Sequence, residues 1–287
     1  MATFMGLYKS LNGEDERTTN HATSWLRTCR ESGIPLRWIE RKHMTESMPP
    51  VFERAHWESE FRRPDWYCRL ERELREYIFP VVHDDPALKV WRHQVYSLAG
   101  EMLERGEIPL ARSGPDLDSE RRPLDTIVLH HTEEGPDISL AKLNAIGLLR
   151  QYGLHYLENN VMGRAARGEP VWSGHFRQGR MVFFAYHWLV RPDGICERLL
   201  EDRVIGWHAG NWSVNTRSVG IALSGNYEHA TPPAEQIEAT ARLISTHYPS
   251  IAHKRVLGHC EIRPNLTCPG DRFLHGWKEQ LMEHLRK

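Results

Sequence analysis

The sequence lacks any apolar run long enough to cross a membrane, because charged residues interrupt each one well before about 18 residues. It also lacks an excess of positive charge: 37 lysines and arginines face 38 aspartates and glutamates. The strongly basic surface that nucleic-acid binding needs is therefore missing. The N-terminus lacks the three parts of a secretory signal, namely a basic region, an apolar core and a cleavage site. We expect no nucleic-acid partner, no membrane insertion and synthesis as a cytoplasmic chain.

Cysteine is scarce. The five cysteines are odd in count, widely spaced, and include no C-x-x-C pair. Without an export signal this excludes a disulfide framework and favours thiols as metal ligands or as small buried apolar groups. Histidine and tryptophan are by contrast abundant, at 17 and 10 in 287 residues. Ordinary fractions of hydrophobic and charged residues, 40% and 26%, exclude intrinsic disorder.

The first part of the chain has the pattern of helices. Helical spacing of apolar residues, bounded by glycine and proline, predicts helices over residues 25–33, 64–79 and 86–105. A stretch rich in glycine, proline, serine and charge follows, and we place a boundary near residues 113–122. Residues 1–115 are thus predicted to form a mainly helical N-terminal domain, whose role and partner the sequence does not reveal.

Residues 116–287 form the second predicted domain, in which strands alternate with helices. Strands are expected over 124–131, 183–190, 218–225 and 255–259, and helices over 139–153, 232–249 and 271–287. The first of these helices is expected to end at Gly153. The fold class is therefore α/β, a mixed central sheet flanked by helices. The long basic loop 159–180 is either a lid or substrate loop, or a solvated insertion.

The loop after the last strand holds the residues with the clearest chemistry. His259 ends that strand and Cys268 follows nine residues later, so the two could share a metal if the loop folds back. Imidazole and thiolate together suit zinc, and a catalytic zinc has three protein ligands with a fourth position open. The pair His130-His131 ends the first strand and could supply the third ligand. Only one of the two can do so, because adjacent strand residues face opposite ways.

Each of these signals is weak alone, since a single strand-end histidine is more often structural and a single cysteine more often part of a core. Together with their neighbours they form four ordered blocks: LDTIVLHHTEE, FFAYHWLVRPDG, GWHAGNWSVNTRSVGIALSGNY and LGHCEIRPNLTCPGD. These blocks resemble those of the zinc N-acetylmuramoyl-L-alanine amidases of type 2, which share their fold with the peptidoglycan recognition proteins and phage amidases. The resemblance covers about residues 122–285.

The resemblance implies one Zn²⁺ per chain and hydrolysis of the amide between N-acetylmuramic acid and L-alanine in peptidoglycan or muropeptides. It implies that His130, His259 and Cys268 are the zinc ligands and that Tyr186 is the catalytic residue beside the metal. His131 and His187 would then face away. The residues implied to border the substrate are Trp207, His208, Asn211, Arg217 and Asn226. His208 is either a proton donor to the leaving amine or a wall residue of the groove.

Two positions depart from the family pattern. Leu266 stands where phage members often carry a lysine, and Ala222 stands where other members carry a glutamate. Arg263 could reach the site in place of the missing lysine. The leading alternative is a recognition module that binds peptidoglycan without cutting it, and a closed structural site would need Cys260 as a fourth ligand. The enzyme could act in the cytosol or reach the cell wall without a signal, as a phage endolysin does.

Overall fold

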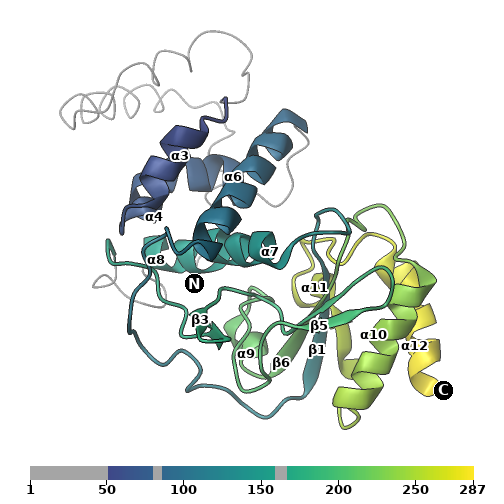
Figure 1. Cartoon of the computed structure of the whole chain (residues 1–287). Helices are drawn as coiled ribbons and strands as arrows, with labels where there is room; N and C mark the ends of the chain where they lie inside the picture. The colour runs from purple at the N-terminus through teal and green to yellow at the C-terminus, as the bar shows by residue number, and fades with distance from the viewer. Residues whose placement is uncertain (1–50, 80–85, 159–166) are drawn as a thin grey trace, which may run out of the picture. The chain divides into compact units, whose positions relative to one another are not determined.

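The computed structural model describes residues 51–79, 86–158 and 167–287, and residues 50–287 form one compact unit (Figure 1). The helix predicted over 25–33 and residues 159–166 of the predicted loop lie outside the described residues. In the part of the chain that is described, no helix has the length and apolar character needed to span a membrane.

A five-stranded mixed sheet forms the centre of this unit and confirms the predicted fold class. Its strands, in spatial order, are β5 (Cys196–Arg198), β4 (Trp188–Val190), β6 (Ser218–Leu223), β1 (Thr126–His131) and β7 (Val256–Gly258). All neighbours are parallel except β5, which returns antiparallel to β4 after the turn at residues 191–194. Every residue of β1 and β6 is buried, as expected for parallel strands covered on both faces. A separate hairpin pairs β2 (Phe176–Arg177) with β3 (Arg180–Met181).

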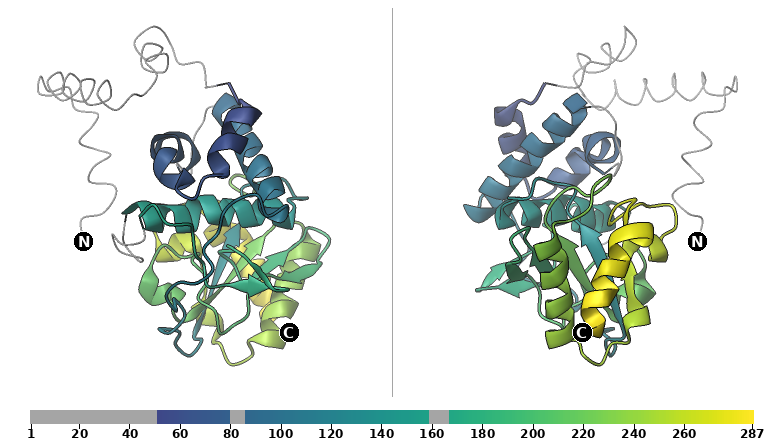
Figure 2. Two further views of the ribbon diagram at one scale, coloured as in Figure 1. Left: turned by 60° about the vertical axis from the view of Figure 1, so that its left-hand side comes forward. Right: turned by 90° about the vertical axis from the view of Figure 1, so that its right-hand side faces the viewer.

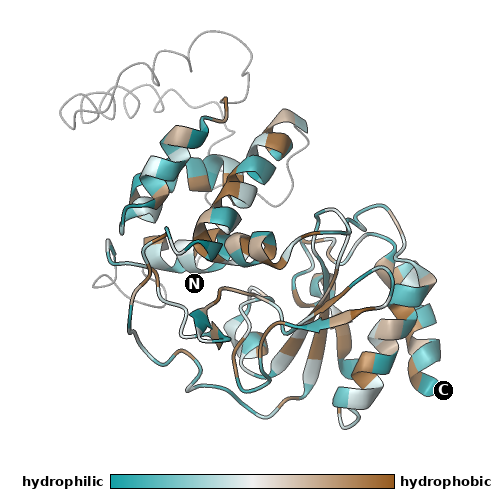
Figure 3. Ribbon diagram, in the orientation of Figure 1, coloured by the Kyte–Doolittle hydropathy of each residue, from teal (hydrophilic) through white to brown (hydrophobic). Residues whose placement is uncertain are grey.

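Helices cover both faces of the sheet. On one face α10 (Ala234–His247) and α12 (Lys278–Arg286) lie side by side (Figures 1 and 2), and Ile237 and Leu281 pack there against Leu129 of β1. On the other face Leu143 of α7 (Leu140–Gly147) packs with Leu189 and Ala222. The strands are largely hydrophobic, whereas the outer surfaces of α10 and α12 carry hydrophilic residues (Figure 3). The layers therefore follow the hydrophobic patterns of the sequence.

The helix after β1 is longer than predicted. A π-helical turn, η4 (Leu148–Tyr152), follows α7 and continues into α8 (Gly153–Glu158). The prediction that Gly153 ends the helix is wrong. Gly153 has φ −59°, the ordinary helical value, and a Cβ atom built on it would lie 4.0 Å or less from side-chain atoms of Phe79 and Trp66. These are ordinary van der Waals separations, so Gly153 is a helical residue at a packed position and does not end the helix.

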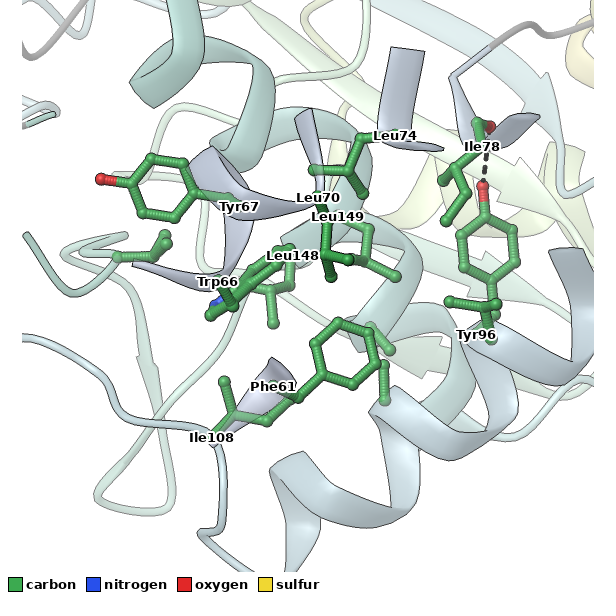
Figure 4. Close-up of a cluster of buried hydrophobic side chains, with 14 of the residues drawn as sticks. Phe61, Trp66, Tyr67, Leu70, Leu74, Ile78, Tyr96, Ile108, Leu148 and Leu149 are labelled. Carbon is green, nitrogen blue, oxygen red and sulfur yellow. Dashed lines mark hydrogen bonds between the residues drawn. The ribbon is translucent and has the colours of Figure 1, made fainter. Parts of the chain in front are cut away.

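A helical layer, defined here as the described part of residues 51–104, packs on η4 and α8. Its elements are α3 (Arg54–Phe61), α4 (Trp66–Arg69), α5 (Glu71–Glu73), η3 (Leu74–Ile78) and α6 (Pro86–Glu104). Phe61, Trp66 and Leu74 share one buried cluster with Leu148 and Leu149 (Figure 4). The predicted boundary near residues 113–122 falls in a connection without helix. The division of the chain at residue 115 stays a prediction.

Candidate functional site

Three chain segments bring the predicted ligands together at the carboxyl edge of the sheet. Strands β1 and β7 are parallel neighbours with Leu129 opposite Gly258, so His130 and His259 follow side by side. The loop after β7 folds back, because the backbone N–H of Cys260 donates to the carbonyl oxygen of Cys268 at 2.7 Å. One potential ligand atom from each of His130, His259 and Cys268 lies within 4.8 Å of the other two.

Hydrogen bonds orient both imidazole rings. Nε2 of His130 lies 3.0 Å from Nδ1 of His208, and Nε2 of His259 donates to the carbonyl oxygen of Ala209 at 3.2 Å. Nδ1 of each ring is therefore left for a metal, and Nδ1 of His130 lies 3.7 Å from Sγ of Cys268. Such bonds to the far ring nitrogen are the usual support of metal-binding histidines.

The charges of this cluster suit Zn²⁺. Burial lowers the pKa of His130 well below 6.5 and that of His259 to about 4, so both imidazoles are neutral at pH 7, the form that binds metals. Burial raises the pKa of the Cys268 thiol, and a hydrogen bond from the backbone of His131 opposes that rise. A divalent cation would stabilise the thiolate further. Two imidazoles and one thiolate fit zinc and leave a fourth coordination position open.

Tyr186 lies beside this cluster, on the segment that leads into β4. Its ring centroid is 5.0 Å from that of His130. Burial raises the pKa of Tyr186, the charge of Cys268 adds to the rise, and the positive charge of Arg150 opposes it. The phenol is therefore protonated at neutral pH and can donate a hydrogen bond.

The two histidines predicted to face away have structural positions. His131 accepts a hydrogen bond from the backbone N–H of Tyr227 at 2.9 Å, and His187 accepts one from that of Gly220 at 3.1 Å. His131 thus points to the side opposite His130, in keeping with the alternation of a strand.

The residues predicted to border the substrate are dispersed. Trp207 and His208 are each only 4% exposed: Trp207 packs between His155 and Trp212, and His208 lies behind His130. Little of either side chain is available to a sugar. The remaining three lie nearer the surface, where Asn211 caps α9 (Trp212–Asn215), Arg217 pairs with Asp125 at 2.7 Å, and Asn226 is exposed. The substrate contacts predicted for these three stay predictions.

Arg263, which the sequence suggested could replace the missing lysine, lies next to the ligand cluster. Its side chain packs over Gly210, where a Cβ atom would come within 2.6 Å of Nη1. Its positive charge helps to lower the pKa of His259, after burial and against the hydrogen bond to Ala209. Leu266, at the position of the family lysine, carries no charge. Arg263 places a positive charge near His259 from the same loop.

Sequence reasoning missed two residues of this region, Glu133 and Arg150. Glu133 follows His130 by three positions and has φ +60°, in the left-handed region that non-glycine residues seldom adopt. Nη2 of Arg150 lies 3.9 Å from Oε2 of Glu133. The acidic pair after His130-His131 was a visible signal for Glu133. Nothing in the local sequence marks Arg150, which looks like any charged helix residue.

Comparisons with known proteins found a matching family model, related sequences and similar solved structures. A family model described as N-acetylmuramoyl-L-alanine amidase matches residues 120–271, more than half of the chain. The 1,6-anhydro-N-acetylmuramyl-L-alanine amidase AmpD of Haemophilus influenzae is 26% identical over 50% of this chain and 82% of its own length. A peptidoglycan-recognition protein of Drosophila melanogaster is 26% identical over 55% of this chain and 74% of its own. Among solved structures, the endolysin amidase LysCS of Clostridium intestinale is 21% identical with a TM-score of 0.40, covering 62% of this chain and 93% of its own.

Proposed function

Because this chain belongs to the N-acetylmuramoyl-L-alanine amidase family, we propose that it is a zinc-dependent hydrolase of the amide bond between N-acetylmuramic acid and L-alanine. The substrate is peptidoglycan or a muropeptide derived from it. The observation that carries this proposal is the cluster of His130, His259 and Cys268, whose ligand atoms lie within 4.8 Å of one another.

The residues around the cluster support hydrolysis rather than binding alone. When bound, Zn²⁺ supplies the Lewis acidity that polarises an amide carbonyl and activates water. His208 and Ala209 hold the two histidine rings in place. Tyr186, protonated and 5.0 Å from His130 between ring centroids, donates a hydrogen bond to the oxyanion that develops on the substrate carbonyl.

The test combines metal analysis with cleavage. Zinc per chain is measured by mass spectrometry on the purified protein, and muropeptides are analysed for peptides with a new L-alanine amine. We expect about one zinc per chain and cleavage that stops with a chelator and returns with added zinc. Cys268→Ala should lose both, whereas Cys196→Ala, an exposed thiol on β5, should lose neither.

Three results would contradict the proposal in different ways. One zinc without cleavage of either polymeric wall or small muropeptides would identify a recognition module, the function named for the Drosophila relative. If Cys260→Ala also released the zinc, the site would be closed and structural. Full activity of Cys268→Ala would show that the ligand assignment is wrong.

A further inference from the structure

Tyr96 of helix α6 connects the helical layer to Arg150, beside the candidate active site. The Tyr96 side chain is fully buried, and its hydroxyl donates to the carbonyl oxygen of Ile78 at 3.2 Å (Figure 4). The same hydroxyl accepts a hydrogen bond from Nε of Arg150 at 2.9 Å. The Arg150 guanidinium carbon lies 5.7 Å from the centroid of the Tyr96 ring. Tyr96 therefore fixes the Arg150 side chain at one end.

The other end of Arg150 faces Glu133. Arg150 projects from η4 (Leu148–Tyr152), and π-helical turns of this kind occur frequently at functional sites. Its Nη2 atom is 3.9 Å from Oε2 of Glu133. Burial lowers the pKa of Arg150, but Tyr96 and Glu133 outweigh this effect and raise it overall. The guanidinium is thus a fixed positive charge between the helical layer and the ligand cluster.

Glu133 lies at the sheet edge where this chain has Ala222 in place of the glutamate of other family members. His130 is opposite Ala222 in the parallel pair of β1 and β6, and Glu133 follows just beyond the end of β1. Glu133 follows the candidate ligand His130 by three residues. Burial raises the pKa of both Cys268 and Tyr186, and the charge of Glu133 adds to each rise. A left-handed backbone, which Glu133 adopts, is strained at a non-glycine residue and persists where the surrounding structure enforces it.

The Glu133 carboxylate lies near the positive charges of Arg150 and Arg92 and near the imidazole of His131. Nδ1 of His131 accepts from Tyr227, so Nε2 carries the proton, and it lies 4.0 Å from Oε1 of Glu133. Both this distance and the 3.9 Å to Arg150 exceed hydrogen-bond length. The carboxylate is held in place while its oxygens can still accept a proton from a small molecule such as water.

We propose that the helical layer is part of the amidase active site: Tyr96 positions Arg150, Arg150 positions Glu133, and Glu133 is the proton-transfer residue of amide hydrolysis. This inference rests on the proposed function. It assigns a catalytic task to the carboxylate that replaces the one missing at Ala222. It also gives α6, which lies outside residues 120–271, a role as the support of that carboxylate.

The step balances with water as the co-reactant. Glu133 takes a proton from the attacking water, whose oxygen forms the new bond to the lactyl carbonyl carbon. The C–N bond then breaks with its electron pair going to nitrogen, and Glu133 returns the proton to that nitrogen. One water is consumed, and the products are the carboxylic acid of the muramyl lactyl group and the free amine of L-alanine.

The experiment measures kcat, KM, zinc content and melting temperature for single substitutions in the full chain, with the muropeptide assay above. Glu133→Gln, which keeps the shape of the side chain, should retain its zinc and lose about 100-fold or more in kcat. Tyr96→Phe should lower kcat about tenfold through misplacement of Arg150, with KM nearly unchanged. Arg150→Lys should retain more kcat than Arg150→Met, because lysine keeps the positive charge. It should still fall below the unmodified protein, because lysine lacks the planar guanidinium.

Tyr67→Phe is the matched control. Tyr67 is a fully buried tyrosine of the same helical layer, and its hydroxyl bonds to the backbone of Gly168 and Glu169, away from Arg150. It should lower the melting temperature without lowering kcat. Equal losses of kcat in Tyr67→Phe and Tyr96→Phe would reduce Tyr96 to a structural residue, and unchanged kcat in Glu133→Gln would overturn the assignment of Glu133. Absence of cleavage by the unmodified, zinc-loaded protein would instead show that the proposed function itself fails.

Discussion

The far nitrogen of His130 is bound by a second buried histidine: Nε2 of His130 lies 3.0 Å from Nδ1 of His208. If Nδ1 of His130 binds the metal, Nε2 of His130 carries the proton and donates a hydrogen bond to Nδ1 of His208. Nε2 of His208 then carries a proton and donates to Oγ of Ser218, 3.1 Å away. These hydrogen bonds select one tautomer of each ring, in a chain that runs from His130 through His208 to Ser218 of β6.

Replacement of His208 should weaken metal binding. His208→Phe keeps an aromatic ring, somewhat larger than imidazole, but leaves Nε2 of His130 buried without its acceptor, and loss of such a partner lowers metal affinity about 10- to 100-fold. Titration of zinc against a competing chromophoric chelator measures the change. Ser218→Ala removes only the outer bond and should cost less. A His208→Phe protein that binds zinc as tightly as the unmodified chain would contradict this role.

Tyr186→Phe should separate metal binding from turnover. The substitution removes only the hydroxyl, so zinc content should be unchanged. Because removal of one hydrogen-bond donor to an oxyanion costs about 100-fold in kcat, we expect a loss of that order with little change in KM. Steady-state kinetics with zinc analysis on the same sample tests this. Retention of full kcat would remove Tyr186 from the mechanism.

The metal-free protein should lose stability as the pH falls below neutrality. Burial lowers the pKa of His155 to about 4 and that of His187 to about 3, from an ordinary value of 6.5. Below pH 6.5 the unfolded chain binds protons that the folded chain does not. The contribution of these groups to the free energy of unfolding is therefore complete above pH 6.5 and declines as the pH falls toward 4 for His155 and 3 for His187.

Urea unfolding at several pH values measures this decline, which can reach about 1.4 kcal/mol per pH unit for each group. Because phenylalanine cannot be protonated, His155→Phe should remove the contribution of His155 to this decline. The free energy of unfolding should then fall less steeply with pH. A free energy of unfolding that is the same at pH 6.5 and pH 4.5 would show that these histidines take up protons in the folded state.

Gly147→Ala should destabilise the contact between α7 and the segment before β4. A Cβ atom at this position would lie 1.6 Å from the carbonyl oxygen of Phe183, so the backbone of one element must move. Overpacking of this kind costs about 1–3 kcal/mol or more in the free energy of unfolding. Gly135→Ala is the matched control, because no atom lies within 4 Å of its Cβ position. Equal melting temperatures of the two variants would contradict the expected clash.

The local sequence was sufficient where the structure depends on periodicity. Apolar alternation and helix signals predicted the order of strands and helices in residues 116–287, and the mixed sheet confirms the fold class. The strand expected over 183–190 is shorter than predicted and forms only as β4, Trp188–Val190. The prediction failed at Gly153, which has the helical φ of −59° and lies where η4 continues into α8. Its surroundings include Phe79 and Trp66 of the helical layer, more than 70 positions away in the chain, so a window around Gly153 does not contain its tertiary environment.

The sequence by itself determined the family and the candidate ligands, because His130, His259, Cys268 and Tyr186 stand in ordered motifs in or beside predicted strands. Only the tertiary structure decided how these residues are supported. His208 meets His130 across 78 positions, and Tyr96 meets Arg150 across 54. Such pairs form when elements pack against one another, and a linear pattern records the residues of each element but not which side chains of two elements touch.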